Sequence, residues 1–284
     1  AECSRAAGRW TQVVPWDRMG YLNLTNTSYI IAFARRYRME RPDRFRGPDA
    51  CRCGFCSRAG GVRRFDGDHD ESDCMKRGWN KTLVHHTIVD ALVRMLKHCG
   101  GFVEGSIKSE YKYWDPARVG TDGTRRVPDV TCTDKQGKEY VIDARIFWNA
   151  MSESSNGFMA YTDTGVGAVR GEAEKRRSWD AAMLRRAEAA PAGVEFIPFS
   201  LEASGVWGPA ARRFFAKCLY LADDDRDIDV YHWSSAKFSS TWHDTFSILL
   251  ARGRAQVSVA ASRGDWPKRT QDQAYSDQNH ASAA

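Results

Sequence analysis

The chain has no long hydrophobic run: among its 284 residues, no apolar stretch approaches the roughly 18 residues that a membrane-spanning helix needs. Its first residues, Ala1 to Arg5, also lack the pattern of a signal peptide. The sequence therefore predicts a soluble protein with no membrane partner. The chain does not begin with Met, and we expect a processed or trimmed product whose compartment, intracellular, nuclear or organellar, stays open.

Internal repeats, polymerase motifs and a strong charge imbalance are also lacking. The chain has 42 Lys and Arg against 36 Asp and Glu, a formal net charge of +6. This mildly basic balance is compatible with an anionic partner such as DNA or RNA, but many proteins without such a partner share it. A chain of this length can bury at least one full core, so we expect one main domain with appendages.

Apolar periodicity predicts an α/β fold, with a mixed sheet flanked by helices. Helices are predicted over residues 27–39, 82–98, 168–189, 205–222 and 235–252. Strands are predicted over residues 102–113, 127–133, 139–146 and 194–201, the first three forming a meander. Residues 115–125 and 149–167 are predicted loops, and the polar tail from Gly264 onward is predicted to be disordered.

Clustered cysteines predict a structural zinc site. Cys53, Cys56, His69 and Cys74 supply three thiolates and one imidazole, a complete tetrahedral set for Zn²⁺. Four protein ligands leave no position for a reacting water, so the metal would staple a segment that lacks its own apolar core. Cys51 can replace Cys53 or Cys56, and the spacing does not decide between them. Reduced thiols beside a surface histidine are the simpler alternative.

Two acids at neighbouring strand ends predict a divalent-cation site. Asp129 begins one strand and Asp143 ends the next, so the hairpin brings their carboxylates together. Hard oxygen ligands suit Mg²⁺ or Mn²⁺, which polarises a phosphodiester and activates a water, and this favours cleavage of nucleic acid. The simpler alternatives are turn chemistry at Asp129 and an ordinary salt bridge from Asp143 to Arg145 or Lys175.

The order of these motifs resembles a known family. The motifs are Asp68-His69 with Cys74, the helix led by His86, Pro128-Asp129-Val130, Asp143, the run Glu172 to Arg176, the strand Glu195 to Phe199 with Glu202, Gly205 and Gly208, and the run Arg252 to Ala255. Over about residues 25–260 this order resembles the region after reverse transcriptase in non-LTR retrotransposons, a restriction-like endonuclease of the PD-(D/E)XK superfamily with a CCHC zinc motif. The resemblance implies a restriction-endonuclease-like core that hydrolyses DNA.

The resemblance also implies catalytic roles. Asp129 and Asp143 become the metal-binding acids, and Lys175, on the following helix, becomes the lysine that orients or stabilises the attacking hydroxide. The chain departs from the superfamily's simplest form at Arg145, where that form has Lys. Arginine stabilises charge but is a poor general base, so catalysis depends on whether Lys175 reaches the metal.

Further residues receive weaker assignments. Arg176 and Arg177 would contact phosphates without reading sequence. Glu110 is a candidate extra acid, weighed against a solvated strand carboxylate. His86 receives only a supporting role, because a histidine at a helix start is more often structural than catalytic.

We divide the chain into an N-terminal helical extension (1–50), a zinc-binding segment (51–80), a nuclease-like core (81–222), a C-terminal helical region (223–263) and a disordered tail (264–284). The favoured function is a metal-dependent DNA endonuclease. The alternative is a catalytically silent, domesticated descendant that serves as a structural or RNA-binding subunit of a larger ribonucleoprotein, which the missing polymerase and Arg145 favour. A zinc-containing DNA-binding protein is a third possibility, but we identify no base-reading residues.

Overall fold

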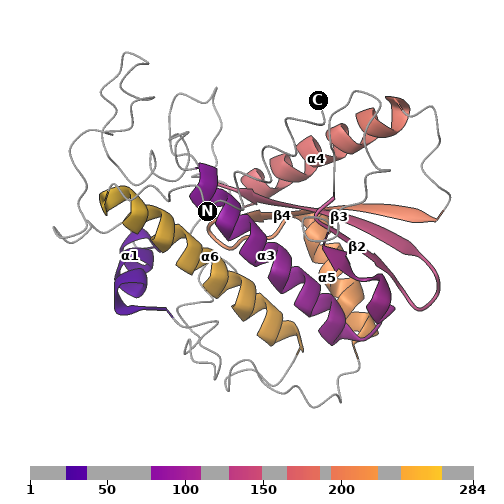
Figure 1. Cartoon of the computed structure of the whole chain (residues 1–284), viewed down its shortest axis with the longest axis horizontal. Helices are drawn as coiled ribbons and strands as arrows, with labels where there is room; N and C mark the ends of the chain where they lie inside the picture. Colours follow the sequence, from indigo (N-terminus) through magenta and orange to yellow (C-terminus); the bar gives the residue numbers. More distant parts are fainter. Residues whose placement is uncertain are drawn as a thin grey trace, which may run out of the picture.

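The structure, a computed structural model, describes residues 24–36, 78–109, 128–148, 165–185, 193–222 and 238–263. Its helices are α1 (Asn26–Arg36), α3 (Gly78–Cys99), the 3-10 helix η5 (Glu104–Ser106), α4 (Val166–Arg185), α5 (Pro209–Leu221) and α6 (Phe238–Arg263). Its strands are β1 (Lys108–Ser109), β2 (Val130–Thr133), β3 (Glu139–Phe147) and β4 (Val194–Glu202). The predicted α/β class is confirmed, since the four strands form one mixed sheet with helices around it (Figure 1).

The sheet has the order β1-β2-β3-β4. Strands β1, β2 and β3 pair antiparallel as the predicted meander, and β4 joins β3 in parallel after the crossover helix α4. Ile142, Ala144 and Ile146 of β3 join the main hydrophobic core, which also takes in buried side chains of α3, α5 and α6. Asp143 and Arg145 alternate with these residues and contact α4 instead. Helix α4 therefore covers one face of the sheet, and α3, α5 and α6 lie on the other (Figure 1).

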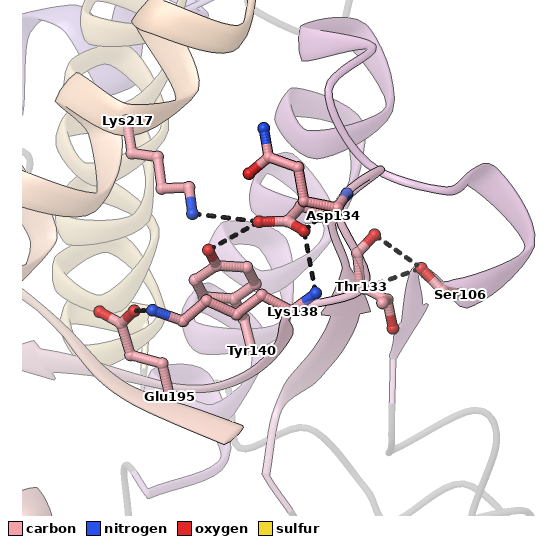
Figure 2. Close-up of polar contacts among 8 residues, drawn as sticks. Ser106, Thr133, Asp134, Lys138, Tyr140, Glu195 and Lys217 are labelled. Atoms are coloured by element: carbon pink, nitrogen blue, oxygen red, sulfur yellow. Dashed lines mark hydrogen bonds and ion pairs between the residues drawn. The ribbon is translucent and has the colours of Figure 1, made fainter. Parts of the chain in front are cut away.

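A buried carboxylate closes the turn between β2 and β3. Asp134 is 1% exposed, and its Oδ1 accepts hydrogen bonds from the backbone N–H groups of Gln136 and Lys138, each at 3.0 Å. Its Oδ2 accepts the hydroxyl of Tyr140 at 2.9 Å and the ammonium of Lys217 at 3.1 Å (Figure 2). Because the turn and the first residues of β3 are tied to one side chain, the register of the hairpin is set.

Two buried glutamates, both in motifs that carry the family resemblance, cap the starts of two helices. Glu202, at the end of β4, accepts the backbone N–H of Gly167 at 2.9 Å and so caps the start of α4. Glu172, on α4, accepts the N–H of Ala210 at 2.8 Å and caps the start of α5. A Cβ at Gly208 would lie 2.1 Å from Oε1 of Glu172, so glycine is needed there. These residues lock α4 between β4 and α5.

The predicted strand over residues 102–113 is wrong in its first half. The 3-10 helix η5 interrupts it, and only Lys108–Ser109 forms a strand, while residues 110–113 lie outside the described part of the chain. The hydroxyl of Ser106 donates to the carbonyl of Val103 at 2.6 Å, a local bond that competes with strand pairing. Residues 104–106 therefore form a 3-10 turn where the alternation of apolar and polar residues predicted an extended strand.

The predicted bounds of the last two helices also need correction. Helix α5 starts later than the predicted range 205–222, because Gly205 has a φ of 97° and lies in a turn. Helix α6 continues well beyond the predicted range 235–252, through Gly253. A Cβ at Gly253 would lie 2.5 Å from a side-chain methyl of Val84 in α3, so this glycine permits close helix packing and does not end the helix.

None of the helices in the described ranges combines the length and apolarity that a bilayer crossing requires. Most of the predicted N-terminal extension, the loop over residues 115–125, most of the loop over 149–167 and the tail from residue 264 lie outside the described residues.

Candidate functional site

The two predicted acids lie opposite each other where the β2–β3 ladder ends. The last paired residues are Val130 and Ile142, and one further step along both strands sets Asp129 opposite Asp143. The two carboxyl groups influence each other electrostatically, since the carboxylate of Asp129 raises the pKa of Asp143. Their side chains are 19% and 23% exposed, so both acids lie half-buried at the surface. The hairpin thus brings together the pair that the sequence singled out.

Pro128 interrupts the backbone hydrogen bonding between the two strands of the hairpin. The same register sets Pro128 opposite Ala144, and proline has no backbone N–H to offer the carbonyl of Ala144. The N–H of Ala144 instead donates to Oδ2 of Asp129 at 2.7 Å. The side chain of Asp129 therefore takes the position of a strand partner, which fixes the orientation of its carboxylate.

An imidazole from α3 completes this arrangement. Nε2 of His85 lies 3.2 Å from the carbonyl oxygen of Ala144 and 3.3 Å from Oδ2 of Asp129. A carbonyl oxygen can only accept a hydrogen bond, so Nε2 carries the hydrogen and donates. His85 therefore holds two oxygen atoms that belong to different strands.

The sequence pointed to the neighbouring His86, in a supporting role, and not to His85. The rotation of α3 decides between them, because adjacent helical positions are about 100° apart. His85 lies in line with Val89, Leu92 and Leu96, each 0% exposed, whereas the line from His86 through Asp90, Val93 and Lys97 is only partly buried or exposed. The apolar line through His85 is the signal in the sequence that could have identified it.

Lys175 reaches the acids from the opposite face of the sheet. Its Nζ on α4 lies 2.6 Å from Oδ1 of Asp143, and the lysine side chain is 26% exposed. The two acids are thus flanked by two basic side chains, His85 from α3 and Lys175 from α4. The predicted trio of Asp129, Asp143 and Lys175 lies within one cluster of contacts.

The surroundings of the two acids shift their pKa values in opposite directions. Burial and the nearby carboxylate of Asp129 raise the pKa of Asp143 to about 6, against the lowering effect of Lys175. Burial also acts to raise the pKa of Asp129, but the hydrogen bond and charge of His85 outweigh it and hold that pKa below its ordinary value. Burial lowers the pKa of His85, and Asp129 more than compensates, so the pKa of His85 lies above its ordinary value. The pair therefore titrates as a coupled dyad.

Arg145 does not pair with the acids in the described contacts. Its Nη2 lies 2.7 Å from Oε2 of Glu174, whose Oε1 also accepts from Nε of Arg170 at 3.0 Å. Of the two bases considered as partners for Asp143, Lys175 makes the ion pair. Within the part of the chain that the structure describes, Arg145 is therefore bound to α4 and not to the acids.

The remaining predicted site residues divide into two groups. Arg176 and Arg177 follow Lys175 on α4 and are exposed. Glu110 and the predicted zinc ligands lie outside the described residues; those ligands are Cys53, Cys56, His69 and Cys74, with Cys51 as the alternative. Cys99, Cys132 and Cys218 are buried, and the thiol of Cys99 donates to the carbonyl oxygen of Cys218 at 3.2 Å.

The donor atoms fit a hard divalent cation. In the described part of the chain, no group of three or more His, Cys, Asp or Glu side chains is arranged to hold a metal ion. A cation would therefore depend on the carboxylates of Asp129 and Asp143 and on the nearby carbonyl oxygen of Ala144. These are all oxygen donors, which suits Mg²⁺ or Mn²⁺. The raised pKa of Asp143 also reflects the proximity of a second acid, a repulsion that a cation relieves.

No protein-family model matches the chain, and no curated protein matches it significantly.

Proposed function

We propose that this protein is a metal-dependent DNA endonuclease of the PD-(D/E)XK kind, derived from a non-LTR retrotransposon. The observation that carries the proposal is the meeting of Asp129, Asp143 and Lys175, which come from the hairpin and from α4. Each residue alone has an ordinary structural explanation. Their meeting at one half-buried point on the sheet favours a shared chemical function.

Each residue has a distinct part in phosphodiester hydrolysis. Asp129 and Asp143 would hold Mg²⁺ or Mn²⁺, and the cation would supply Lewis-acid polarisation of the phosphate and lower the pKa of a bound water. Lys175 remains next to Asp143, and its ammonium stabilises negative charge on the attacking hydroxide or on the phosphate oxygens. Lysine on the helix thereby performs the task that Arg145, bound to Glu174, does not perform.

The surroundings of the acids support a nucleic-acid substrate. The exposed Arg176 and Arg177 lie on the same helix as Lys175 and are available to phosphates. The β1–β3 meander, with β4 added in parallel through α4, is compatible with a restriction-endonuclease-like core. The predicted zinc segment would be an appended staple.

One observation favours a second candidate function. His85 donates to Asp129, and Lys175 pairs with Asp143, so both acids are neutralised by the protein's own side chains. A fold that no longer cleaves could keep such a closed cluster. The second candidate is therefore a silent descendant that binds RNA or supports a larger ribonucleoprotein.

A plasmid-nicking assay tests the proposal. Supercoiled plasmid is incubated with the full chain and Mg²⁺ or Mn²⁺, and the native protein is compared with Asp129→Ala. We expect nicking by the native chain that requires the cation and is lost in the variant. Nucleic-acid binding without nicking at any concentration of either cation would contradict the proposal and favour the silent descendant.

A further inference from the structure

We propose that His85 is a positioning residue for the divalent-cation site. Its Nε2 lies 3.3 Å from Oδ2 of Asp129 and 3.2 Å from the carbonyl oxygen of Ala144, and so fixes the orientation of this carboxylate and this carbonyl, whose remaining lone pairs would bind a cation. The inference rests on the proposed function, because it concerns the cation that the endonuclease would use. It adds a residue of α3 to a site otherwise built from the hairpin and α4.

His85 can support these oxygens without competing for all of their lone pairs. A carbonyl oxygen accepts two hydrogen bonds, and a carboxylate has about four acceptor sites. Oδ2 of Asp129 accepts the N–H of Ala144 and the hydrogen of His85, so the other oxygen of this carboxylate, Oδ1, is the one that would bind a cation. One donated hydrogen from Nε2 therefore orients the two oxygens and still leaves donor sites for a cation.

Support is needed because the ladder does not supply it. The carbonyl of Ala144 lies opposite Pro128, which has no N–H, so the strand pairing does not fix this carbonyl. His85 supplies the missing donor. Groups that hydrogen-bond to metal-binding oxygens orient them, and their loss typically weakens metal affinity about 10- to 100-fold.

The imidazole is attached to a rigid support. Val84, Ile88 and Val89 surround His85 in the sequence of α3 and are all buried in the core. The His85 side chain is 27% exposed and is not among the side chains of the main hydrophobic core, so substitutions there leave that core in place. Variants at this position should therefore fold and report on cation binding.

The experiment measures Mn²⁺ binding by the full-length chain, using the electron paramagnetic resonance signal of free Mn²⁺. The native protein is compared with His85→Ala, His85→Gln and the matched control His86→Ala, with folding checked by circular dichroism. We expect His85→Ala to weaken Mn²⁺ binding about 10- to 100-fold. His85→Gln should recover part of the affinity, because its amide donates from a similar reach, and His86→Ala should bind as the native chain does.

Nicking at varied Mn²⁺ gives a second readout. His85→Ala should raise the Mn²⁺ concentration needed for half-maximal rate, with little change in the rate at saturation. Native Mn²⁺ affinity in His85→Ala would overturn the inference and leave the proposed nuclease intact. Mn²⁺ binding that weakens in His85→Ala, in a protein that cuts no plasmid, would support the inference and overturn the nuclease. Binding of Mn²⁺ that is unchanged in Asp129→Ala would overturn the inference.

Discussion

Nζ of Lys175 lies 2.6 Å from Oδ1 of Asp143, although 32 positions and a change of element separate the two residues. The strand position two residues after Asp143 is held by Arg145, which binds Glu174 instead. The helix therefore supplies the ammonium that the strand does not. Glu202 and Glu172, which cap α4 and α5, hold α4 in the position that makes this contact.

The first prediction concerns the acid dyad. In the absence of metal, a ¹³C NMR titration of the Asp143 carboxyl should give a pKa of about 6. Asp129→Asn removes a charge that raises this pKa and should lower it, whereas Lys175→Met removes a charge that lowers it and should raise it further. A carboxyl titrating at its ordinary value of 3.8 would contradict the described proximity.

The same raised pKa has consequences for pH dependence. Because the folded-state pKa lies above the ordinary 3.8, this group's contribution to stability is fully present below 3.8 and is lost as pH rises through about 6. Cation binding has the opposite dependence, because a proton competes with the metal for the carboxylate. Mn²⁺ affinity should therefore fall as pH is lowered through about 6. Affinity independent of pH across this window would exclude Asp143 as a ligand.

The second prediction concerns Arg145. Arg145→Lys should weaken the contact with Glu174 but change nicking little, because Lys175 already provides the ammonium at Asp143. The double variant Arg145→Lys with Lys175→Ala should remain as inactive as Lys175→Ala alone. Recovery of nicking in the double variant would show that the strand position can supply the catalytic lysine.

The third prediction concerns the turn between β2 and β3. Asp134→Ala leaves Lys217, Tyr140 and two backbone N–H groups without their acceptor, and should lower the free energy of unfolding by about 3 kcal/mol. Urea denaturation measures this loss. Lys138→Ala, which removes an exposed ion pair with Glu195 and a cation–π contact with Tyr140, is the control and should cost about 1 kcal/mol or less. Equal losses in the two variants would show that Asp134 does not set the hairpin.

The sequence was most informative where structure is local. The β2–β3 hairpin follows from alternation on both sides of a turn that contains Gly137, whose φ is 86°. This hairpin alone predicts that Asp129 and Asp143 meet. The catalytic role of Lys175 was predicted only through the resemblance, because its approach to the acids depends on the packing of α4 against the sheet, which the spacing of residues does not encode.

Other features of the fold and the site depend on contacts between elements, which are difficult to predict from a single sequence. In the sequence, Gly253 has the features of a residue that ends a helix. In the structure, it lies inside α6, where its lack of a side chain lets α3 pack closely. The choice between His85 and His86 depends on the rotation of α3, and the apolar line through His85 was the available signal. The turn at η5 follows from a local hydrogen bond from Ser106 to Val103 and from a bond that Ser106 accepts from the backbone of Thr133 in β2, which together outweigh alternation in a short strand.

The fourth prediction concerns zinc. Protein purified without chelator should carry about one zinc per chain by elemental analysis, because the four predicted ligands bind it as a closed site. Cys74→Ser should lose that zinc. Cys132→Ala, which alters a buried cysteine in β2, should retain it. Absence of zinc from the native protein would contradict the predicted staple.

The fifth prediction tests most directly the central claim that Asp129, Asp143 and Lys175 form the cleavage site. The measurement is the single-turnover rate of plasmid nicking at saturating Mn²⁺. The variant is Lys175→Ala, and Arg176→Ala, on the same helix, is the control. Removing the ammonium beside Asp143 should slow nicking about 10²- to 10³-fold, whereas removing the exposed arginine should affect mainly DNA affinity. Equal single-turnover rates for Lys175→Ala and the native chain would show that the cluster of Asp129, Asp143 and Lys175 is not the cleavage site.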